Sequence, residues 1–314
     1  MYPDPKSVTR VTTLGAGPIG GGWAAHFLAR GYDVTAYIHS EAETAALMSV
    51  INTGWISLQA LGLSPGASLD RLRITTDLAD AVKDAQFIQE SAPERLDIKQ
   101  ALYKRLGELA PRDCVIASST SGLMMTQIQA DCPSPQRTVI GHPFNPPYLL
   151  PLVEVVGGKA TEPEAVAWAV AFYEIAGKAP LAMKKEIPGF VATRLQEALW
   201  REALHMVANG EATPADIDNA LMNGPAARMA VQGQCMAFHV ACGEGGMATN
   251  LDQFGPALKW PWTRLEAPEL TQELRDRMVD GCNEIAAGRH FEAMAATRDR
   301  EIVAVLNAIR DARR

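Results

Sequence analysis

Short apolar runs alternate with longer amphipathic segments over residues 8–183. The short runs are rich in Val, Ile and Thr and predict strands, whereas the longer segments carry apolar residues at helical spacing. The predicted strands are residues 8–14, 32–39, 72–76, 85–90, 114–119, 138–142, 151–156 and 179–183. The predicted helices are residues 21–31, 41–63, 77–84, 96–110 and 163–177. Strands that alternate with helices predict an α/β fold with a doubly wound, mostly parallel sheet covered on both faces.

The pattern changes at KKEIPGF, residues 184–190, after which only helical segments follow. The first of these helices is predicted to begin at Pro188. The segment 213–224 opens with Thr-Pro and has an Asp three residues after the Thr, which predicts a capped helix start. A chain of 314 residues exceeds the size of one typical core. We therefore predict an α/β domain over residues 1–187 and an all-helical domain over residues 188–314.

Composition and charge exclude several classes of partner. The 29 basic and 36 acidic residues give a net charge of −7 without a basic cluster, so neither nucleic acid nor an anionic membrane surface is expected to bind. No apolar run reaches the roughly 18 residues that a membrane span needs, and we do not expect the N-terminal MYPDPKSVTR to be a signal peptide. The five cysteines form no C-x-x-C pair, which favours a reduced, cytoplasmic setting. The six histidines lack metal-ligand spacing, so no metal site is expected.

A glycine-rich turn separates the first predicted strand from the first predicted helix. GAGPIG places Gly15, Gly17 and Gly20 in G-x-G-x-x-G spacing, with Pro18 and Ile19 inside the motif. At such a position the glycines allow a tight turn, the approach of a pyrophosphate to the backbone, and close packing of helix and strand. The pattern therefore predicts a Rossmann-type domain with a dinucleotide at the helix N-terminus, and a glycine-rich turn without a ligand is the alternative.

The second predicted strand lacks the acidic residue that usually binds the ribose 2′-hydroxyl of NAD. Ile38, His39 and Ser40 stand at its end, with Glu41 just beyond, and no Arg is present to accept the 2′-phosphate of NADP. These residues alone leave the choice between NAD and NADP open.

The stretch HPFNPPYLLPLVEVVGG, residues 142–158, places one His and one Glu among prolines and aliphatic residues. Burying a carboxylate without a partner is costly. His142 ends one predicted strand and Glu154 lies in the next, so the two side chains can meet once the Pro-rich loop turns back. We therefore predict a His–Glu pair in which the carboxylate fixes the imidazole tautomer and stabilises its charged form. A satisfied core His and a separate Glu near the surface are the alternative.

Three segments resemble the 3-hydroxyacyl-CoA dehydrogenase family: GHPFNPPYLLPLVEVVGG, SSTSGL and PGFVATRL. The resemblance covers nearly the whole chain. QESAPERLDIK, EALWREALHMV and DQFGPALKWPWTRLEAPELT are most similar to its L-carnitine dehydrogenase branch, and the gulonate dehydrogenase (lambda-crystallin) branch is similar around GHPFNPPYLLPLVE. The resemblance implies an NAD-dependent oxidoreductase whose helical second domain binds substrate and forms a homodimer. The broad apolar surface of EALWREALHMV is in keeping with such an interface.

The resemblance also implies roles for single residues. His142 matches the general base of the family and Glu154 the carboxylate paired with it. Ser121 and Asn145 match the residues that hold the substrate oxygen. Thr193 replaces an Asn or Asp of relatives at a substrate-binding position. The further cofactor-binding positions are Glu94, Lys99 and Ser119.

The charge of one segment bears on the substrate. Residues 41–70 contain no Lys or Arg, whereas the phosphates of coenzyme A need cations. This favours a small free 3-hydroxy acid, and the branch resemblance points to the oxidation of L-carnitine to 3-dehydrocarnitine. Another free 3-hydroxy acid (gulonate-like) and a 3-hydroxyacyl-CoA are the alternatives. A non-catalytic NAD-binding protein, like a crystallin or a sensor, is an alternative of a different class.

Carnitine needs a cation for its carboxylate and aromatic faces for its trimethylammonium group. Arg194 and Arg201 are the candidate cations, with a solvated helix face as the alternative. The candidate aromatic residues are Tyr148, Phe238, Trp260 and Trp262. In one stretch this chain differs from the carnitine dehydrogenases that it resembles. It has Met229, Val231 and Cys235 where they carry further aromatic residues.

Overall fold

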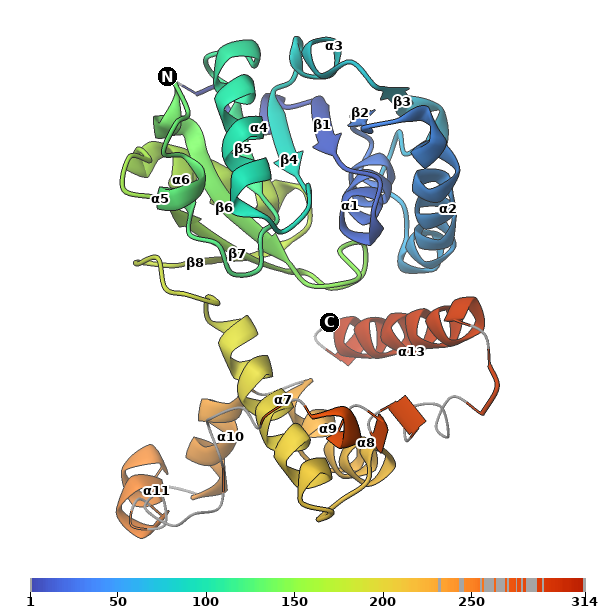
Figure 1. The fold of residues 1–314 in the computed structure, drawn as a ribbon, viewed down its shortest axis with the longest axis vertical. Helices are drawn as coiled ribbons and strands as arrows, with labels where there is room; N and C mark the ends of the chain where they lie inside the picture. The colour runs from blue at the N-terminus through green and yellow to red at the C-terminus, as the bar shows by residue number, and fades with distance from the viewer. Residues whose placement is uncertain are drawn as a thin grey trace. The chain divides into compact units, whose positions relative to one another are not determined.

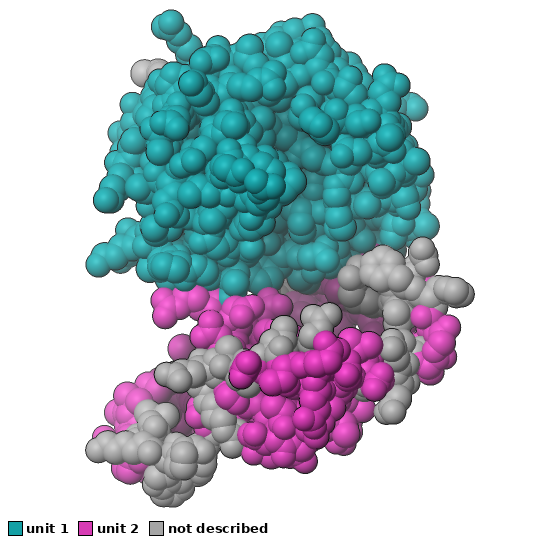
Figure 2. Space-filling model, in the orientation of Figure 1, with its two compact units in different colours: residues 1–193 teal, residues 194–314 magenta. Residues whose placement is uncertain are grey.

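The computed structural model describes residues 2–230, 233–242, 246–254, 256, 263, 269, 271–274, 276–277, 279–280, 287–289 and 291–312. The chain forms two compact units, Met1–Thr193 and Arg194–Arg314, which Figure 2 shows in different colours. Unit 1 contains the sheet. All secondary-structure elements described in unit 2 are helices.

The sheet of unit 1 has eight strands in the order β3-β2-β1-β4-β5-β6-β7-β8 (Figure 1). Their bounds are β1 Arg10–Leu14, β2 Asp33–Tyr37, β3 Leu72–Thr75, β4 Phe87–Glu90, β5 Val115–Ser118, β6 Thr138–Pro143, β7 Leu152–Gly157 and β8 Ala179–Ala182. All neighbours pair in parallel except β6 and β7, which are antiparallel. The predicted doubly wound, mostly parallel sheet is confirmed. The chain reverses its winding between β1 and β4, where such sheets bind their ligands.

Two different cores cover the two faces of this sheet. The helices of unit 1 are α1 Pro18–Ala29, α2 Thr44–Leu61, α3 Leu78–Val82, α4 Leu96–Leu109, α5 Met125–Ile128 and α6 Pro163–Ile175. On one face Phe87 of β4 packs against aromatic rings of α1 and α6, including Phe27 and Phe172. On the other face Ile88 joins an aliphatic cluster that contains Leu78 of α3 and Leu106 of α4. Successive residues of a strand point to opposite faces, so one strand supplies both cores.

The described helices of unit 2 include one long helix at each end. They are α7 Ala192–Ala208, α8 Pro214–Asn223, α9 Pro225–Met229, α10 Gln234–Ala241, α11 Gly246–Phe254 and α13 Phe291–Ala312. The predicted cap of α8 is confirmed, since Thr213 and Asp216 each bond the other's backbone N–H. Across the described part of the chain, no helix is both long and apolar enough to cross a bilayer.

The start of α7 differs from its predicted position. The helix begins at Ala192 rather than at Pro188, because Gly189 and Phe190 have φ angles of 70° and 50°. Neither residue is in the right-handed helical region. A left-handed conformation is uncommon for a Phe, and this one is fully buried, so packing in unit 1 outweighs its local preference.

Candidate active site

The turn after β1 requires glycine at two positions. Gly15 has a φ of 114°, and a β-carbon there would lie 2.6 Å from the Ser91 carbonyl oxygen. A β-carbon at Gly20 would lie 2.1 Å from the carbonyl oxygen of Gly15. The Gly15 N–H donates to the carbonyl of Tyr37 at 3.0 Å, which holds the turn beside the end of β2. The tight turn and the close helix packing predicted from the motif are both present.

The start of α1 fits the phosphates of a dinucleotide. Gly17 is the N-cap residue, and no side chain forms a capping hydrogen bond there. No atom lies within 4 Å of the position that a β-carbon of Gly17 would take. Pro18 and Ile19 open the helix, and Pro18 has no N–H to satisfy. No side chain therefore caps the first N–H groups of α1, and the helix dipole at this end favours an anion.

A carboxylate does lie at the end of β2, although it comes from later in the chain. Ser40 caps a 3₁₀ turn formed by Glu41–Glu43. Glu43 turns back and its Oε2 accepts the backbone N–H of His39 at 2.9 Å. Glu43 lies beyond the residues that directly follow the strand, where an acidic residue is expected, and it was not identified from the sequence. The S-x-x-E spacing of a capping box was the signal that could have found it.

His142 and Glu154 lie directly opposite each other on the antiparallel strands β6 and β7. The imidazole Nδ1 is 2.9 Å from Glu154 Oε2, and both side chains are buried. The predicted contact is therefore confirmed. The other oxygen, Oε1, accepts the backbone N–H groups of Val191 and Ala192, each at 2.8 Å. Glu154 thus joins the His to the N-terminus of α7.

The hydrogen bonds around Glu154 keep it charged. Burial by itself would raise its pKa, but the bonds from His142 and from the N–H groups of Ala192 and Val191 outweigh burial and lower the pKa below its usual value. A charged carboxylate can only accept a hydrogen bond, so Nδ1 of His142 must be the donor. Nε2 is then the nitrogen that can take a proton from a substrate.

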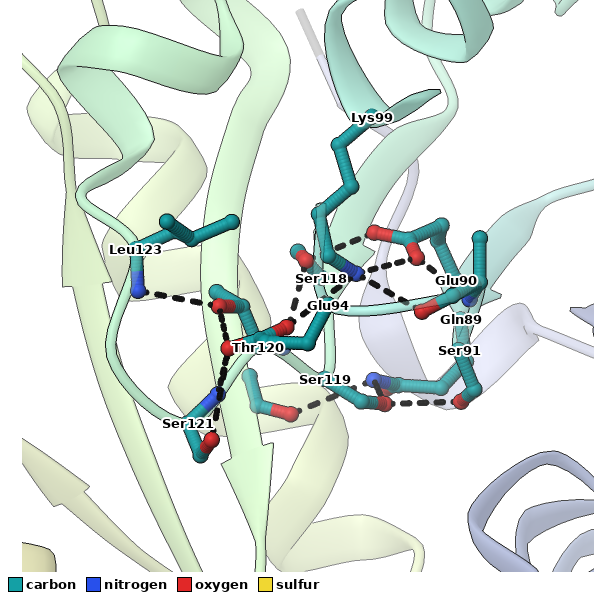
Figure 3. A network of polar contacts seen from close by, with 12 residues as sticks. Gln89, Glu90, Ser91, Glu94, Lys99, Ser118, Ser119, Thr120, Ser121 and Leu123 are labelled. Carbon is teal, nitrogen blue, oxygen red and sulfur yellow. Dashed lines mark hydrogen bonds and ion pairs between the residues drawn. The ribbon is translucent and has the colours of Figure 1, made fainter. Parts of the chain in front are cut away.

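Ser121 lies in a turn that is held by Glu94, as Figure 3 shows. Glu94 Oε1 accepts hydrogen bonds from Thr120 Oγ1 at 2.5 Å, from the Ser121 N–H at 2.9 Å, and from the Ser121 hydroxyl and the Gly122 N–H at 3.3 Å each. Burial would raise the pKa of Glu94, but these bonds and the charge of Lys99 lower it. The predicted catalytic Ser and the predicted cofactor-binding Glu are therefore in direct contact.

A buried ion pair lies behind Glu94. The Lys99 ammonium is 2.7 Å from Glu90 Oε1 and 3.7 Å from Glu94 Oε2, and Lys99 and Glu90 are almost fully buried. The Ser118 hydroxyl donates to Glu90 Oε2 at 2.6 Å. Glu90 was missed from the sequence, although a Glu that ends an apolar strand and precedes a Lys in the next helix is a recognisable pattern. Ser119 lies in the same network and accepts a hydrogen bond from Gln89 at 2.8 Å.

The remaining predicted residues are spread over both units. Asn145 is exposed in the loop between β6 and β7. Tyr148 is buried and its ring packs against Gly54 of α2, so Tyr148 occupies a core position. The predicted substrate-binding residues on helices are Thr193, Arg194 and Arg201 on α7 and Phe238 on α10. Phe238 is 43% exposed. Trp262, Trp260 and Val231 lie outside the described residues.

Comparisons with known proteins identify the family of both parts of the chain. Residues 10–187 match the NAD-binding domain of 3-hydroxyacyl-CoA dehydrogenase and residues 189–280 match its C-terminal domain. The L-carnitine dehydrogenase of Streptomyces griseus subsp. griseus is 58% identical over 304 residues, 97% of this chain and 91% of the relative. The L-carnitine dehydrogenase of Pseudomonas aeruginosa is 48% identical over 307 residues, 97% of this chain and 96% of the relative.

Solved structures are similar as well. The crystal structure of 5-formyl-3-hydroxy-2-methylpyridine 4-carboxylic acid 5-dehydrogenase, an NAD⁺-dependent dismutase, superposes with a TM-score of 0.81 at 30% identity, covering 96% of this chain and 99% of the other. Similarity of this extent spans both the sheet and the helical part of the chain. The chain belongs to the 3-hydroxyacyl-CoA dehydrogenase family.

Proposed function

We propose that this protein oxidises L-carnitine to 3-dehydrocarnitine with NAD as the hydride acceptor. The observation that carries the proposal is the hydrogen bond between His142 Nδ1 and Glu154 Oε2, which leaves Nε2 as a general base. The choice of substrate is supported by eight relatives named L-carnitine dehydrogenase, 43–58% identical over nearly the whole chain.

The reaction needs a proton acceptor and a group that holds the substrate oxygen. His142 Nε2 takes the proton of the substrate hydroxyl, and the Glu154 carboxylate stabilises the imidazolium that forms. Ser121 and Asn145 hold the oxygen as its negative charge develops. Bound NAD supplies the chemistry of hydride acceptance. The start of α1 would hold the cofactor, together with Glu94 and Lys99 from the loop and helix after β4 and Ser119 directly after β5.

The helical domain, residues 188–314, supplies substrate recognition and the dimer interface in this proposal. Arg194 and Arg201 bind the carboxylate of carnitine, and Phe238 and Trp262 hold its trimethylammonium group, which offers no hydrogen-bond donor. Thr193 lines the same site. We place the enzyme in the cytoplasm as a homodimer.

A CoA ester is the less favoured substrate because of the charge of α2. The helix Thr44–Leu61 contains no Lys or Arg, and none occurs between residues 41 and 70. A coenzyme A molecule with its phosphates would find no cation on this element. A small free acid has no such phosphates and needs no cation on α2.

A panel of 3-hydroxy acids tests the proposal. L-carnitine, 3-hydroxybutyrate, L-gulonate and 3-hydroxybutyryl-CoA are each incubated with NAD, and reduced nicotinamide is followed by absorbance. We expect L-carnitine to have the highest kcat/KM. His142→Ala and Glu154→Gln are expected to lower kcat by about a hundredfold while the Kd for NAD changes little, because β4 and β5 separate the strands of the pair from β1, which the glycine turn follows.

Three outcomes would contradict parts of the proposal. Turnover of another acid but not of carnitine would assign a different substrate. Near-wild-type kcat in the His142 variant would remove the general base. Tight NAD binding without turnover of any acid would identify a non-catalytic NAD-binding protein.

A further inference from the structure

We propose that Glu94 is a positioning residue for the reaction, because its carboxylate fixes the turn of residues 120–122 and so presents the Ser121 hydroxyl to the substrate oxygen. The inference rests on the proposed function, in which Ser121 holds that oxygen. It goes beyond the cofactor contact that the family resemblance implies for Glu94.

The contacts of Glu94 are directed at the backbone of the turn. One oxygen, Oε1, accepts the N–H of Ser121 at 2.9 Å and the N–H of Gly122 at 3.3 Å. It also accepts the Thr120 hydroxyl at 2.5 Å, and Thr120 Oγ1 in turn accepts the Leu123 N–H at 3.0 Å. Charge-assisted bonds of this kind are about twice as strong as neutral ones. The carboxylate therefore holds the backbone on both sides of Cα of Ser121.

The Ser121 hydroxyl is held much less firmly than its backbone. Its distance of 3.3 Å to Glu94 Oε1 is at the long end for an O–H···O bond. Ser121 is exposed, so its hydroxyl can turn toward a substrate at the loss of one weak bond. The backbone of the turn is thus held firmly, which places Ser121. The hydroxyl hydrogen of Ser121 is held weakly, so it can point toward the substrate oxygen.

The buried ion pair fixes Glu94 in turn. Lys99 donates to the carbonyl of Ala92 at 3.1 Å, and Glu90 accepts the N–H of Ala92 at 2.6 Å. The short connection from Glu90 to Glu94 is therefore held at Ala92 and at the Lys99 ammonium, as Figure 3 shows for the side chains. The positive charge of Lys99 also offsets one of the two carboxylate charges and so reduces their repulsion of the negative charge that develops on the substrate oxygen.

A double-mutant cycle tests whether Glu94 acts through Ser121. Wild type, Glu94→Gln, Ser121→Ala and the double variant are compared with the acid that the panel shows to be turned over fastest. We expect Glu94→Gln to lower kcat, measured at saturating NAD, by about tenfold, in addition to any loss of NAD affinity that isothermal titration calorimetry shows. The double variant is expected to be no slower than Ser121→Ala alone, since residues that act as a unit are not additive.

Three results would overturn the inference. Losses in kcat that multiply in the double variant would show that Glu94 acts independently of Ser121, and would leave the proposed function intact. A raised Kd for NAD with unchanged kcat would make Glu94 a cofactor contact only. Full kcat in Ser121→Ala would remove the role of Ser121, and this inference with it.

Two further variants supply a matched control and an alternative to Glu94→Gln. Asp97→Asn is the matched control, because Asp97 follows in the same segment, is 65% exposed, and pairs only with Arg95 among the described ion pairs. It is expected to leave kcat and the Kd for NAD unchanged. If Glu94→Gln lowers the thermal midpoint, Thr120→Val serves instead, since it removes the 2.5 Å bond and leaves Glu94 in place. It is expected to lower kcat in the same non-additive way.

Discussion

Buried carboxylates at this site are each matched by donors. Glu154 is fully buried and accepts one imidazole and two backbone N–H groups. Its lowered pKa means that it contributes to folding stability above the ordinary carboxyl pKa, and that this contribution is lost as the pH falls through the lowered value. Glu90, also fully buried, is matched by Lys99, Ser118 and Ala92. Removing a partner from either Glu would leave an uncompensated charge.

Glu43 changes the interpretation of cofactor choice at the residue scale. Its carboxylate is anchored on His39 at the end of β2, beside the glycine turn that Tyr37 holds. We expect Glu43→Gln to weaken NAD binding and to reduce discrimination against NADP by about tenfold or more, because the amide no longer repels a 2′-phosphate. The amide oxygen can still accept the His39 N–H, so the turn is retained.

The dissociation constants of both dinucleotides, measured by calorimetry, check this expectation. Glu41→Gln is the control, because Glu41 lies in the same turn and is exposed. An unchanged preference for NAD in the Glu43 variant would show that its carboxylate does not face the ribose.

At the scale of elements, a buried Lys holds the loop from β6 to β7 through hydrogen bonds. Lys178, just before β8, donates to the carbonyls of Pro147 and Leu150. Its ammonium lies 4.9 Å from the centre of the Trp23 ring on α1. Burial, and to a lesser degree the charge of Arg30, lowers the pKa of Lys178 to about 7. Two backbone carbonyls of the loop that carries Asn145 therefore depend on the Lys178 side chain as their hydrogen-bond donor.

We expect Lys178→Met to lower kcat with little change in NAD affinity, because the loop loses two hydrogen bonds. Stability should also depend on pH. Between the folded pKa of about 7 and the ordinary value of 10.5, the unfolded chain binds the extra proton. The free energy of unfolding of wild type relative to the variant should therefore rise with pH across that window, by up to about 1.4 kcal/mol per pH unit.

Chemical denaturation at several pH values checks the effect on stability. Lys159→Met is the matched control, since Lys159 is exposed and its change should give a flat difference. A pH-independent difference for Lys178→Met would mean that folding does not lower the pKa of Lys178.

At the scale of the whole molecule, α7 carries an apolar surface that its own unit leaves open. Leu195 is 65% exposed, Leu199 51% and Trp200 47%. Leu195 and Leu199 are four residues apart and share one helix face. Apolar surface of this kind is typical of a contact with another chain.

We expect the protein to be a homodimer in solution and Leu199→Lys to shift it toward the monomer, because the charge would have to be buried in the interface. Light scattering at micromolar concentration measures the mass, and Glu197→Lys, also on α7 and exposed, is the control. A monomeric mass for the wild-type protein would contradict the dimer.

Much of the molecule could be predicted from the chain because its determinants are local. The glycine spacing, the strand–helix alternation and the cap at Thr213 depend on neighbours within a few residues, and each of these features is present. The contact between His142 and Glu154 was predictable because only one short loop separates their strands.

Contacts between distant segments were decided only by the tertiary structure. The sequence by itself determined the fold class, the nucleotide turn and the His–Glu pair. The fold decided that Glu94 meets Ser121 across 27 positions and that α7 begins at Ala192. These features depend on where the Glu94 carboxylate finds donors and where the buried Phe190 fits. Such requirements arise from packing many segments together, and no local pattern encodes them.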